Sequence, residues 1–270
     1  TLHSCDIRDI SSLKKVLKDI DIIFNLASQI GHSFSMEKPN EDLDINTVAQ
    51  LNFLEEIKIN CPEALIIYTS TRQVYGVPRY KPVDENHPIN PPDINGINKF
   101  AAEQYHLLYN KVYGLRTVVL RLTNTYGPRM RIKDARQTFL GIWIRNLIEG
   151  KKIQVFGDGE QLRDFNFVED VVDALLSCTI NKNAVGRVFN IGSREVISLS
   201  SLAKNICKLK ENSEWELVPF PKDKKLIDIG NYYTDFSLAK KILNWEPKID
   251  LKEGLEKSFN FYQKYFENYI

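Results

Sequence analysis

The chain has 270 residues, of which 43% are hydrophobic, and this length can hold one large α/β domain or two unequal ones with a substantial core. Its 36 Lys and Arg residues nearly balance its 35 Asp and Glu residues, for a net charge of +1. Such a balance argues against the field of a single sign that attracts nucleic acid or an acidic membrane surface. We therefore expect a small-molecule ligand, with neither nucleic acid nor membrane as a partner.

The four cysteines lie far apart in the sequence and form no C-x-x-C pair. They are Cys5, Cys61, Cys178 and Cys207. This spacing argues against a metal or redox site and predicts reduced thiols. The chain also contains no apolar run of 18 residues and no signal-peptide pattern, so we expect a cytoplasmic protein without a bound metal.

Short apolar segments rich in β-branched residues alternate with segments of helical periodicity. In chain order we predict a strand at 20–27, a helix at 45–59, strands at 63–70 and 116–124 separated by a helix at 99–112, a strand at 151–157, a helix at 168–178 and a strand at 187–192. Strands that are apolar throughout are typical of a parallel sheet buried on both faces. The order predicts a doubly wound α/β fold. Helices at 198–210 and 254–270 dominate the rest.

Polar residues at the ends of the predicted strands carry most of the functional information, because ligands of doubly wound sheets bind at the carboxyl edge. Three such strand ends can be identified in the sequence: NLASQ (25–29), YTSTRQVYG (68–76) and RLTNTYGP (121–128). Each contains small or hydroxyl side chains that let a backbone approach a ligand closely. Taken singly, each is equally compatible with an ordinary junction between strand and loop.

Nine segments, in the same order, resemble the NAD-dependent nucleotide-sugar epimerase and dehydratase group of the extended short-chain dehydrogenase/reductases. They are CDIRD (5–9), NLASQ, DINTVAQLNFLE (44–55), STRQVYG (70–76), NGINKFAAEQY (95–105), LRLTNTYGP (120–128), VFGDGEQLRDFNFVEDVVDAL (155–175), RVFNIGS (187–193) and AKKILNWEP (239–247). The resemblance covers residues 6–270. It implies NAD as cofactor and a nucleotide-sugar as substrate.

The resemblance also implies a division of the chain. Residues 1–127 would form the remainder of a Rossmann-like NAD-binding domain, with 170–195 returning to its sheet, and 128–270 a smaller α/β substrate domain. Members of the group begin with a strand, a G-x-x-G-x-x-G turn and a helix, and the glycines bring the backbone against the cofactor pyrophosphate. Because the sequence starts at TLHSCDIRD, we expect about 50 residues, a βαβ unit, to be missing, together with this cradle.

Several residues are assigned to the cofactor by the resemblance. They are Asp6, Ile7, Leu26, Ala27, Ser28, Gln29, Asn46 and Lys99. Asp6 would bind the adenine amino group with Ile7 beside the ring, and residues 26–29 would lie beneath the nicotinamide ribose. Asn46 would orient that loop. The alternatives are a turn aspartate at Asp6 and a helix-capping asparagine at Asn46.

The catalytic residues implied are Thr71, Asn95 and Lys99. In the group, a tyrosine four residues before the lysine takes the hydroxyl proton; this spacing places both on one helical face, and the ammonium lowers the phenol pKa from about 10. Asn95 occupies the tyrosine position, and an amide can hydrogen-bond a hydroxyl but cannot accept its proton. Lys99 can still bind the nicotinamide ribose. Thr71 would bind the sugar O4.

Asn95 leaves several interpretations open. Tyr75, Tyr68 or a water on Thr71 would serve as a displaced base, with Lys99 acting directly after losing its proton. Alternatively, catalysis is altered or lost while binding is retained, or the Asn is a chance or engineered change. For Lys99 itself, the simple alternative is a solvated helix lysine.

The two residues after Thr71 bear on the reaction. In 4,6-dehydratases these positions are typically an acid pair that serves C6 and C5 of the sugar, whereas here they are Arg72 and Gln73. Neither is a carboxylic acid, which disfavours ordinary 4,6-dehydration. Epimerisation through a transient keto-sugar fits better.

The substrate residues implied by the resemblance are Asn124, Gln137, Phe139, Leu140, Phe156 and Arg163. Arg163 would bind the diphosphate through its fork of donors, or alternatively form a surface salt bridge with Asp164. Val155 would pack with Phe156 beneath the base. A basic loop contains Arg129, Arg131, Lys133 and Arg136, and it either steers an anionic nucleotide or is simply a solvated charged loop. The group also has a second arginine near residues 225–235, which Lys224 or Lys225 would replace here.

We therefore predict an NAD-dependent, epimerase-like enzyme acting on a nucleotide-sugar. The alternatives are a dehydratase, a catalytically impaired NAD or nucleotide-sugar binding protein, and a structural partner subunit. Family members often dimerise, so we expect a homodimer through the helices at 45–59 and 97–112.

Overall fold

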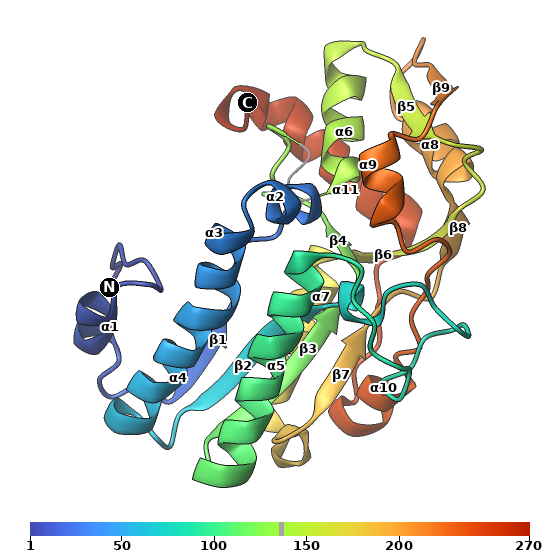
Figure 1. The fold of residues 1–270 in the computed structure, drawn as a ribbon. Helices are drawn as coiled ribbons and strands as arrows, with labels where there is room; N and C mark the ends of the chain where they lie inside the picture. Colours follow the sequence, from blue (N-terminus) through green and yellow to red (C-terminus); the bar gives the residue numbers. More distant parts are fainter. Residues whose placement is uncertain (135–137) are drawn as a thin grey trace.

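A four-stranded parallel sheet forms the centre of the computed structural model, which describes residues 1–134 and 138–270 (Figure 1). Its strands are β1 (Ile22–Asn25), β2 (Leu65–Thr71), β3 (Arg116–Leu122) and β7 (Val188–Ile191), in the order β1-β2-β3-β7. All neighbouring pairs are parallel, with Ile67 opposite Val118. The predicted α/β class and these four strands are confirmed.

Helices cover both faces of this sheet. The helices α4 (Ala49–Asn60) and α5 (Ile94–Tyr113) lie on one face, and α7 (Val168–Ile180) lies on the other (Figure 1). The side chains of β2 alternate accordingly: Ile67 joins the cluster that contains Val171, whereas Ile66 joins the cluster that contains Leu54. Burial on both faces explains why the parallel strands are apolar throughout.

Short helical segments connect β1 to α4 and β2 to α5. They are α2 (His32–Glu37), α3 (Pro39–Leu43), the π-helical turn η1 (Asp44–Val48) and the 3-10 turn η2 (Arg72–Tyr75), while α1 (Ile10–Val16) precedes β1 and packs on α4. The helix predicted at 45–59 is therefore a π-helical turn followed by an α-helix. Such turns are frequent at functional sites.

Local capping signals set the limits of α5, the helix that carries Lys99. The Asp93 side chain accepts a hydrogen bond from the Gly96 backbone N–H, and Gly114 ends the helix in the left-handed conformation at φ 75°. The helix thus begins at Ile94, one and a half turns before the residue 99 predicted from its apolar pattern.

The second half of the chain builds a smaller α/β assembly that Figure 1 shows at one end of the main sheet. Its strands are β4 (Asn124–Tyr126), β6 (Leu162–Phe167) and β8 (Val196–Ser198) in one sheet and β5 (Ile153–Phe156) with β9 (Trp215–Val218) in another. Its helices are α6 (Phe139–Glu149), α8 (Leu199–Cys207), α9 (Lys222–Leu226) and α11 (Leu251–Tyr265), and α10 (Ser237–Leu243) packs beside β7. Trp143, Phe165, Leu202 and Phe259 share its core.

Within the ranges that the structure describes, no helix is both long and apolar enough to cross a lipid bilayer.

Candidate functional site

Two adjoining cavities lie where the main sheet meets the smaller assembly. The larger has a volume of about 860 Å³ and the smaller about 220 Å³. Four residues line both cavities, namely His32, Arg72, Asn124 and Thr138, so the two form one continuous site. The smaller cavity is bordered by the carboxyl ends of β1, β2 and β3, the position where doubly wound sheets bind ligands.

Lys99 projects from α5 into the smaller cavity and is only 5% exposed. Its Nζ donates a hydrogen bond of 2.6 Å to the Thr69 carbonyl oxygen and lies 4.5 Å from the centre of the Tyr68 ring. Burial lowers the pKa of Lys99 to about 7, although the carboxylates of Asp42 and Glu103 act in the opposite direction. This lysine is therefore not a solvated helix lysine, and that alternative is wrong.

Asn95 also borders the smaller cavity, but its side chain is occupied with holding a loop. Its Nδ2 lies 2.9 Å from the Gln29 carbonyl oxygen and 3.0 Å from Oδ2 of Asp42. Asn46 holds the same loop, because its amide bonds both the N–H and the carbonyl of Gln29, at 3.0 and 2.9 Å. The two asparagines, one from η1 and one from α5, both hold the segment after β1.

The two tyrosines considered as displaced bases are locked inside the protein, and neither lines a cavity. The Tyr75 hydroxyl donates to Oδ1 of Asn190 and accepts from Nη1 of Arg121, both at 2.7 Å, and burial raises its pKa to about 12. Tyr68 is fully buried, and burial raises its pKa well above the ordinary value. The interpretation that either tyrosine replaces the missing base is wrong.

Small polar side chains at the strand ends fit a ribose with its hydroxyl groups. The Ser70 Oγ is buried beside Lys99 and has no hydrogen-bond partner among the described residues. Thr71, Ser28 and Leu26 line the same cavity, and the Thr71 Oγ1 accepts a 3.2 Å bond from the Gln73 N–H. An unsatisfied hydroxyl next to a cation is a site for a ligand with several hydroxyl groups, as the ribose next to a nicotinamide would be.

Four of the residues assigned to the cofactor do not line either cavity, namely Asp6, Ile7, Ala27 and Asn46. Asp6 is paired with Arg8 at 2.7 Å, and this hydrogen bond lowers the pKa of the carboxyl to about 2. Ile7 packs against the cluster beneath α4, and Ala27 contributes only a carbonyl that accepts from Gln50 at 3.0 Å. The assignment of Asp6 and Ile7 to the adenine remains a prediction.

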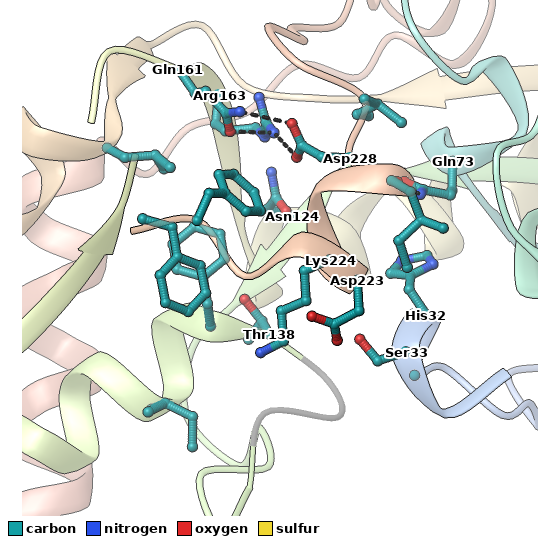
Figure 2. A pocket seen from close by; sticks show the side chains of 18 of the residues that line it. His32, Ser33, Gln73, Asn124, Thr138, Gln161, Arg163, Asp223, Lys224 and Asp228 are labelled. Atoms are coloured by element: carbon teal, nitrogen blue, oxygen red, sulfur yellow. Dashed lines mark hydrogen bonds and ion pairs between the residues drawn. The ribbon is translucent and has the colours of Figure 1, made fainter. Parts of the chain in front are cut away.

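Arg163 stands on β6 at the wall of the larger cavity and is 4% exposed. Figure 2 shows its guanidinium joined to Gln161 and Asp228, at 3.1 and 3.3 Å. It also donates to the carbonyl oxygens of Leu162 and Gly230. The predicted alternative of a surface salt bridge with the neighbouring carboxylate, Asp164, is wrong, because Arg163 is buried and pairs with Asp228, while Asp164 accepts from Oγ1 of Thr123 at 2.6 Å.

A second guanidinium, from Arg72, faces both cavities. Its Nη2 donates a hydrogen bond of 3.0 Å to Oδ1 of Asn124, and its Cζ lies 5.2 Å from the centre of the Tyr232 ring. Its buried Nη1 has no hydrogen-bond partner among the described residues. Burial lowers the pKa of Arg163 to about 10, and the nearby charge of Arg72 adds to this. A buried and a half-buried cation with a spare donor favour an anionic ligand. From the sequence alone, Arg72 indicates only that an acid is absent at this position.

Aromatic side chains complete the larger cavity. Phe139, Trp143, Phe156 and Phe220 line it, and Nζ of Lys224 lies 5.3 Å from the centre of the Phe156 ring. These faces and the cation suit a planar heterocycle.

Among the described residues, none of the other predicted substrate contacts lines the larger cavity. Leu140 and Val155 are fully buried in the core, which does not agree with contact between these side chains and a ligand. Lys225 does not line the cavity. Gln137 and Arg136 lie outside the described residues. The described basic residues of the loop do not line a cavity either, and Arg131 is paired with Asp134 at 2.6 Å.

Comparisons with known proteins agree with this geometry. A profile of the NAD-dependent epimerase/dehydratase family matches residues 1–192. A putative UDP-glucose 4-epimerase of Methanocaldococcus jannaschii is 35% identical over 259 residues, which are 96% of this chain and 82% of that protein.

Solved structures show the same relationship. The UDP-glucose 4-epimerase of Thermotoga maritima with UDP-glucose superposes with a TM-score of 0.89 at 28% identity, over 98% of this chain and 84% of that one. The UDP-glucuronic acid 4-epimerase of Bacillus cereus with UDP-glucuronic acid and NAD gives a TM-score of 0.83 at 27% identity, over 95% and 80%. The chain therefore belongs to the NAD-dependent epimerase/dehydratase family, whose members are nucleotide-sugar enzymes with NAD as cofactor.

Proposed function

We propose that this protein is a nucleotide-sugar epimerase, which oxidises one carbinol of the sugar to a ketone and returns the hydrogen from the opposite side. The carrying observation is the continuous site, in which a buried lysine lines one cavity and two arginines, the buried Arg163 and the half-buried Arg72, line the other. The names of the relatives, UDP-sugar 4-epimerases among them, support this reaction.

The site divides between cofactor and substrate. Lys99, Ser70 and the loop at 26–29 would hold the nicotinamide ribose, so residues 1–127 and 170–195 form the cofactor half. The remainder of residues 128–270 forms the substrate half, in which Arg163 would bind the diphosphate together with Arg72 of the cofactor half, and Phe156 would pack on the base. When bound, NAD supplies a reversible acceptor for the hydride of the carbinol carbon.

Lys99 would also stabilise the reacting oxygen of the sugar. Its Nζ uses one N–H on the Thr69 carbonyl, and an ammonium has three donors. The remaining donors stabilise the negative charge that develops on the carbinol oxygen as its proton leaves. Asn95 cannot accept that proton, because it is an amide whose donors already bind Gln29 and Asp42.

Epimerisation is favoured over dehydration by the residues that follow Thr71. Elimination of water needs a group that removes a proton from carbon and an acid that protonates the departing hydroxyl. Arg72 cannot deprotonate, and the Gln73 amide is bonded to Asp93 at 2.8 Å.

The Arg163→Gln variant tests the nucleotide half. We expect the affinity for UDP, measured by isothermal titration calorimetry, to fall about 10- to 100-fold, because a hydrogen bond to a charged group contributes roughly 1.5–3 kcal/mol. Arg194→Gln is the control, since Arg194 is an exposed residue paired with Glu246 at 2.9 Å. Equal affinities in the two variants would show that the diphosphate binds elsewhere.

The reaction itself is tested by NMR of UDP-, dTDP-, GDP- and CDP-sugars incubated with NAD and the protein. Conversion of one sugar to its epimer supports the proposal. Loss of water from the sugar would instead identify a dehydratase, and binding without conversion would identify an impaired enzyme.

We also propose a homodimer through α4 and α5. Ile97, Leu108 and Val112 of α5 are each about half exposed, at 53%, 48% and 58%, and share one face of the helix. Leu108→Arg should convert a dimer into a monomer in light scattering, whereas Val172→Arg on the opposite side of the sheet should not. A wild-type protein that is monomeric at high concentration contradicts this proposal.

A further inference from the structure

A histidine and a buried aspartate form a pair at the junction of the two cavities. His32 is the first residue of α2, and its Nδ1 lies 2.9 Å from Oδ2 of Asp93. The Asp93 side chain is fully buried, while 37% of the His32 side chain is exposed. The ring therefore presents its Nδ1 edge to the carboxylate and the rest of its surface to the cavities, both of which it lines.

The carboxylate of Asp93 is held rigidly. It accepts hydrogen bonds from the Gly96 N–H at 2.7 Å and from Nε2 of Gln73 at 2.8 Å. Figure 2 shows His32 beside Gln73 on one side of the larger cavity. Nδ1 of His32 lies 2.9 Å from this carboxylate but makes no hydrogen bond of complete geometry, so a small rotation of the ring would let it donate to Asp93 and leave Nε2 as the acceptor.

Among the described residues that line the smaller cavity, no other group combines a ring nitrogen with a buried carboxylate in this way. Of the four histidines, only His32 lines a cavity: His87 bonds the Arg79 N–H at 2.8 Å, and His106 is buried against Tyr68. Lys99 already donates to a carbonyl and faces an aromatic ring, and both contacts favour the ammonium.

We propose that His32, oriented by Asp93, is the group that takes the sugar hydroxyl proton in place of the tyrosine that Asn95 replaces. This inference rests on the proposed epimerase reaction. The carbinol loses its hydroxyl proton to Nε2 of His32 and its carbon-bound hydride to NAD, so that it becomes a ketone. In the reverse transfer both return to the sugar, and the histidine and the cofactor are restored.

The inference is tested first without turnover. Diethyl pyrocarbonate modifies accessible neutral imidazoles, and peptide mass spectrometry reports each histidine separately. We expect UDP-glucose with NAD to slow modification of His32 at least tenfold and to leave the exposed His3 unchanged. Equal rates at His32 with and without these ligands would overturn the inference, whether or not the protein proves to be an epimerase.

Kinetics of His32→Asn and His32→Ala then separate proton transfer from binding. The asparagine keeps a donor for Asp93 but has no proton acceptor of this kind, so we expect kcat to fall about 100- to 10,000-fold with the UDP-glucose Kd within threefold. Imidazole in the buffer should restore part of the activity of His32→Ala but none to Lys99→Met. His3→Gln is the matched control.

The outcomes differ for the two proposals. If the wild-type protein converts no sugar of the panel, the epimerase proposal fails, and ligand protection of His32 alone decides whether it belongs to the site. If the wild type is active and His32→Asn keeps kcat within threefold, the epimerase proposal stands and the role of His32 is refuted.

Discussion

Lys99→Met should lower kcat/KM by about 100- to 1,000-fold, the usual effect of removing one donor that stabilises a developing oxyanion. The Nζ that the variant lacks is the buried cation of the smaller cavity, and methionine fills a similar volume without a donor. Affinity for NAD should fall as well, because the same nitrogen would bind the nicotinamide ribose. Turnover by NMR and NAD titration by calorimetry measure the two effects.

The pH dependence of the activity and stability of the wild type provides a second test of the role of Lys99. Burial lowers its pKa to about 7, against the carboxylates of Asp42 and Glu103, while His106 and the Tyr68 ring also face it. The ammonium is the working form, so kcat/KM should decline as the pH rises through about 7. The stability of the protein should change with pH in the opposite direction. Between about pH 7 and 10 Lys99 is protonated in the unfolded state and neutral in the folded state, so the free energy of unfolding should rise with pH across that interval.

Lys99→Met should remove that rise and leave the protein at least as stable at pH 6, since no charge is buried. Lys111→Met, an exposed lysine near the end of the same helix, is the control and should behave as the wild type. A wild-type kcat/KM that does not change between pH 6 and 9 would contradict the ammonium role.

The elements that could be predicted from the sequence are those specified by local pattern. The strands of the main sheet are apolar runs buried on both faces, and the helices that cover them carry apolar stripes, so their periodicity is readable. The strands β4, β6 and β8 were not predicted as separate strands. They are short, and β6 buries Arg163 and Asp164, whose burial is tolerable only because Asp228 and Thr123 bond them across the fold.

The candidate site divides in the same way. Lys99, Thr71 and Arg163 could be found because they occur in continuous motifs with a recognisable order. Asp228 could not, because it meets Arg163 across 65 residues of chain. In the sequence, His32 is only a histidine shortly after a predicted strand end. Its proposed role depends on its proximity to Asp93, the residue that caps α5 about 60 positions later.

Arg121→Met should lower the free energy of unfolding by about 3–5 kcal/mol, because it leaves a carboxylate buried without its charge partner. Nε of Arg121 donates 3.0 Å to Oε2 of Glu103, whose side chain is fully buried, and a second, shorter bond runs from Nη2 to Oε1. The same guanidinium donates a hydrogen bond to the Tyr75 hydroxyl, which in turn donates to the side chain of Asn190 on β7. Urea unfolding with an unchanged m-value measures the loss.

The double variant Glu103→Met with Arg121→Met should recover much of that stability, because two apolar side chains replace a buried ion pair at little net cost. Single and double variants with the same stability loss would contradict a dominant role for the unpaired charge.

The double variant also connects this ion pair to the active site. Glu103 lies one turn after Lys99 on α5, so its bond to β3 sets the depth at which the helix presents the lysine. Its negative charge raises the pKa of Lys99 and opposes the effect of burial. Without that charge the ammonium loses its proton at lower pH. The decline of kcat/KM should therefore begin at lower pH in the double variant than in the wild type, even where the two proteins are equally folded.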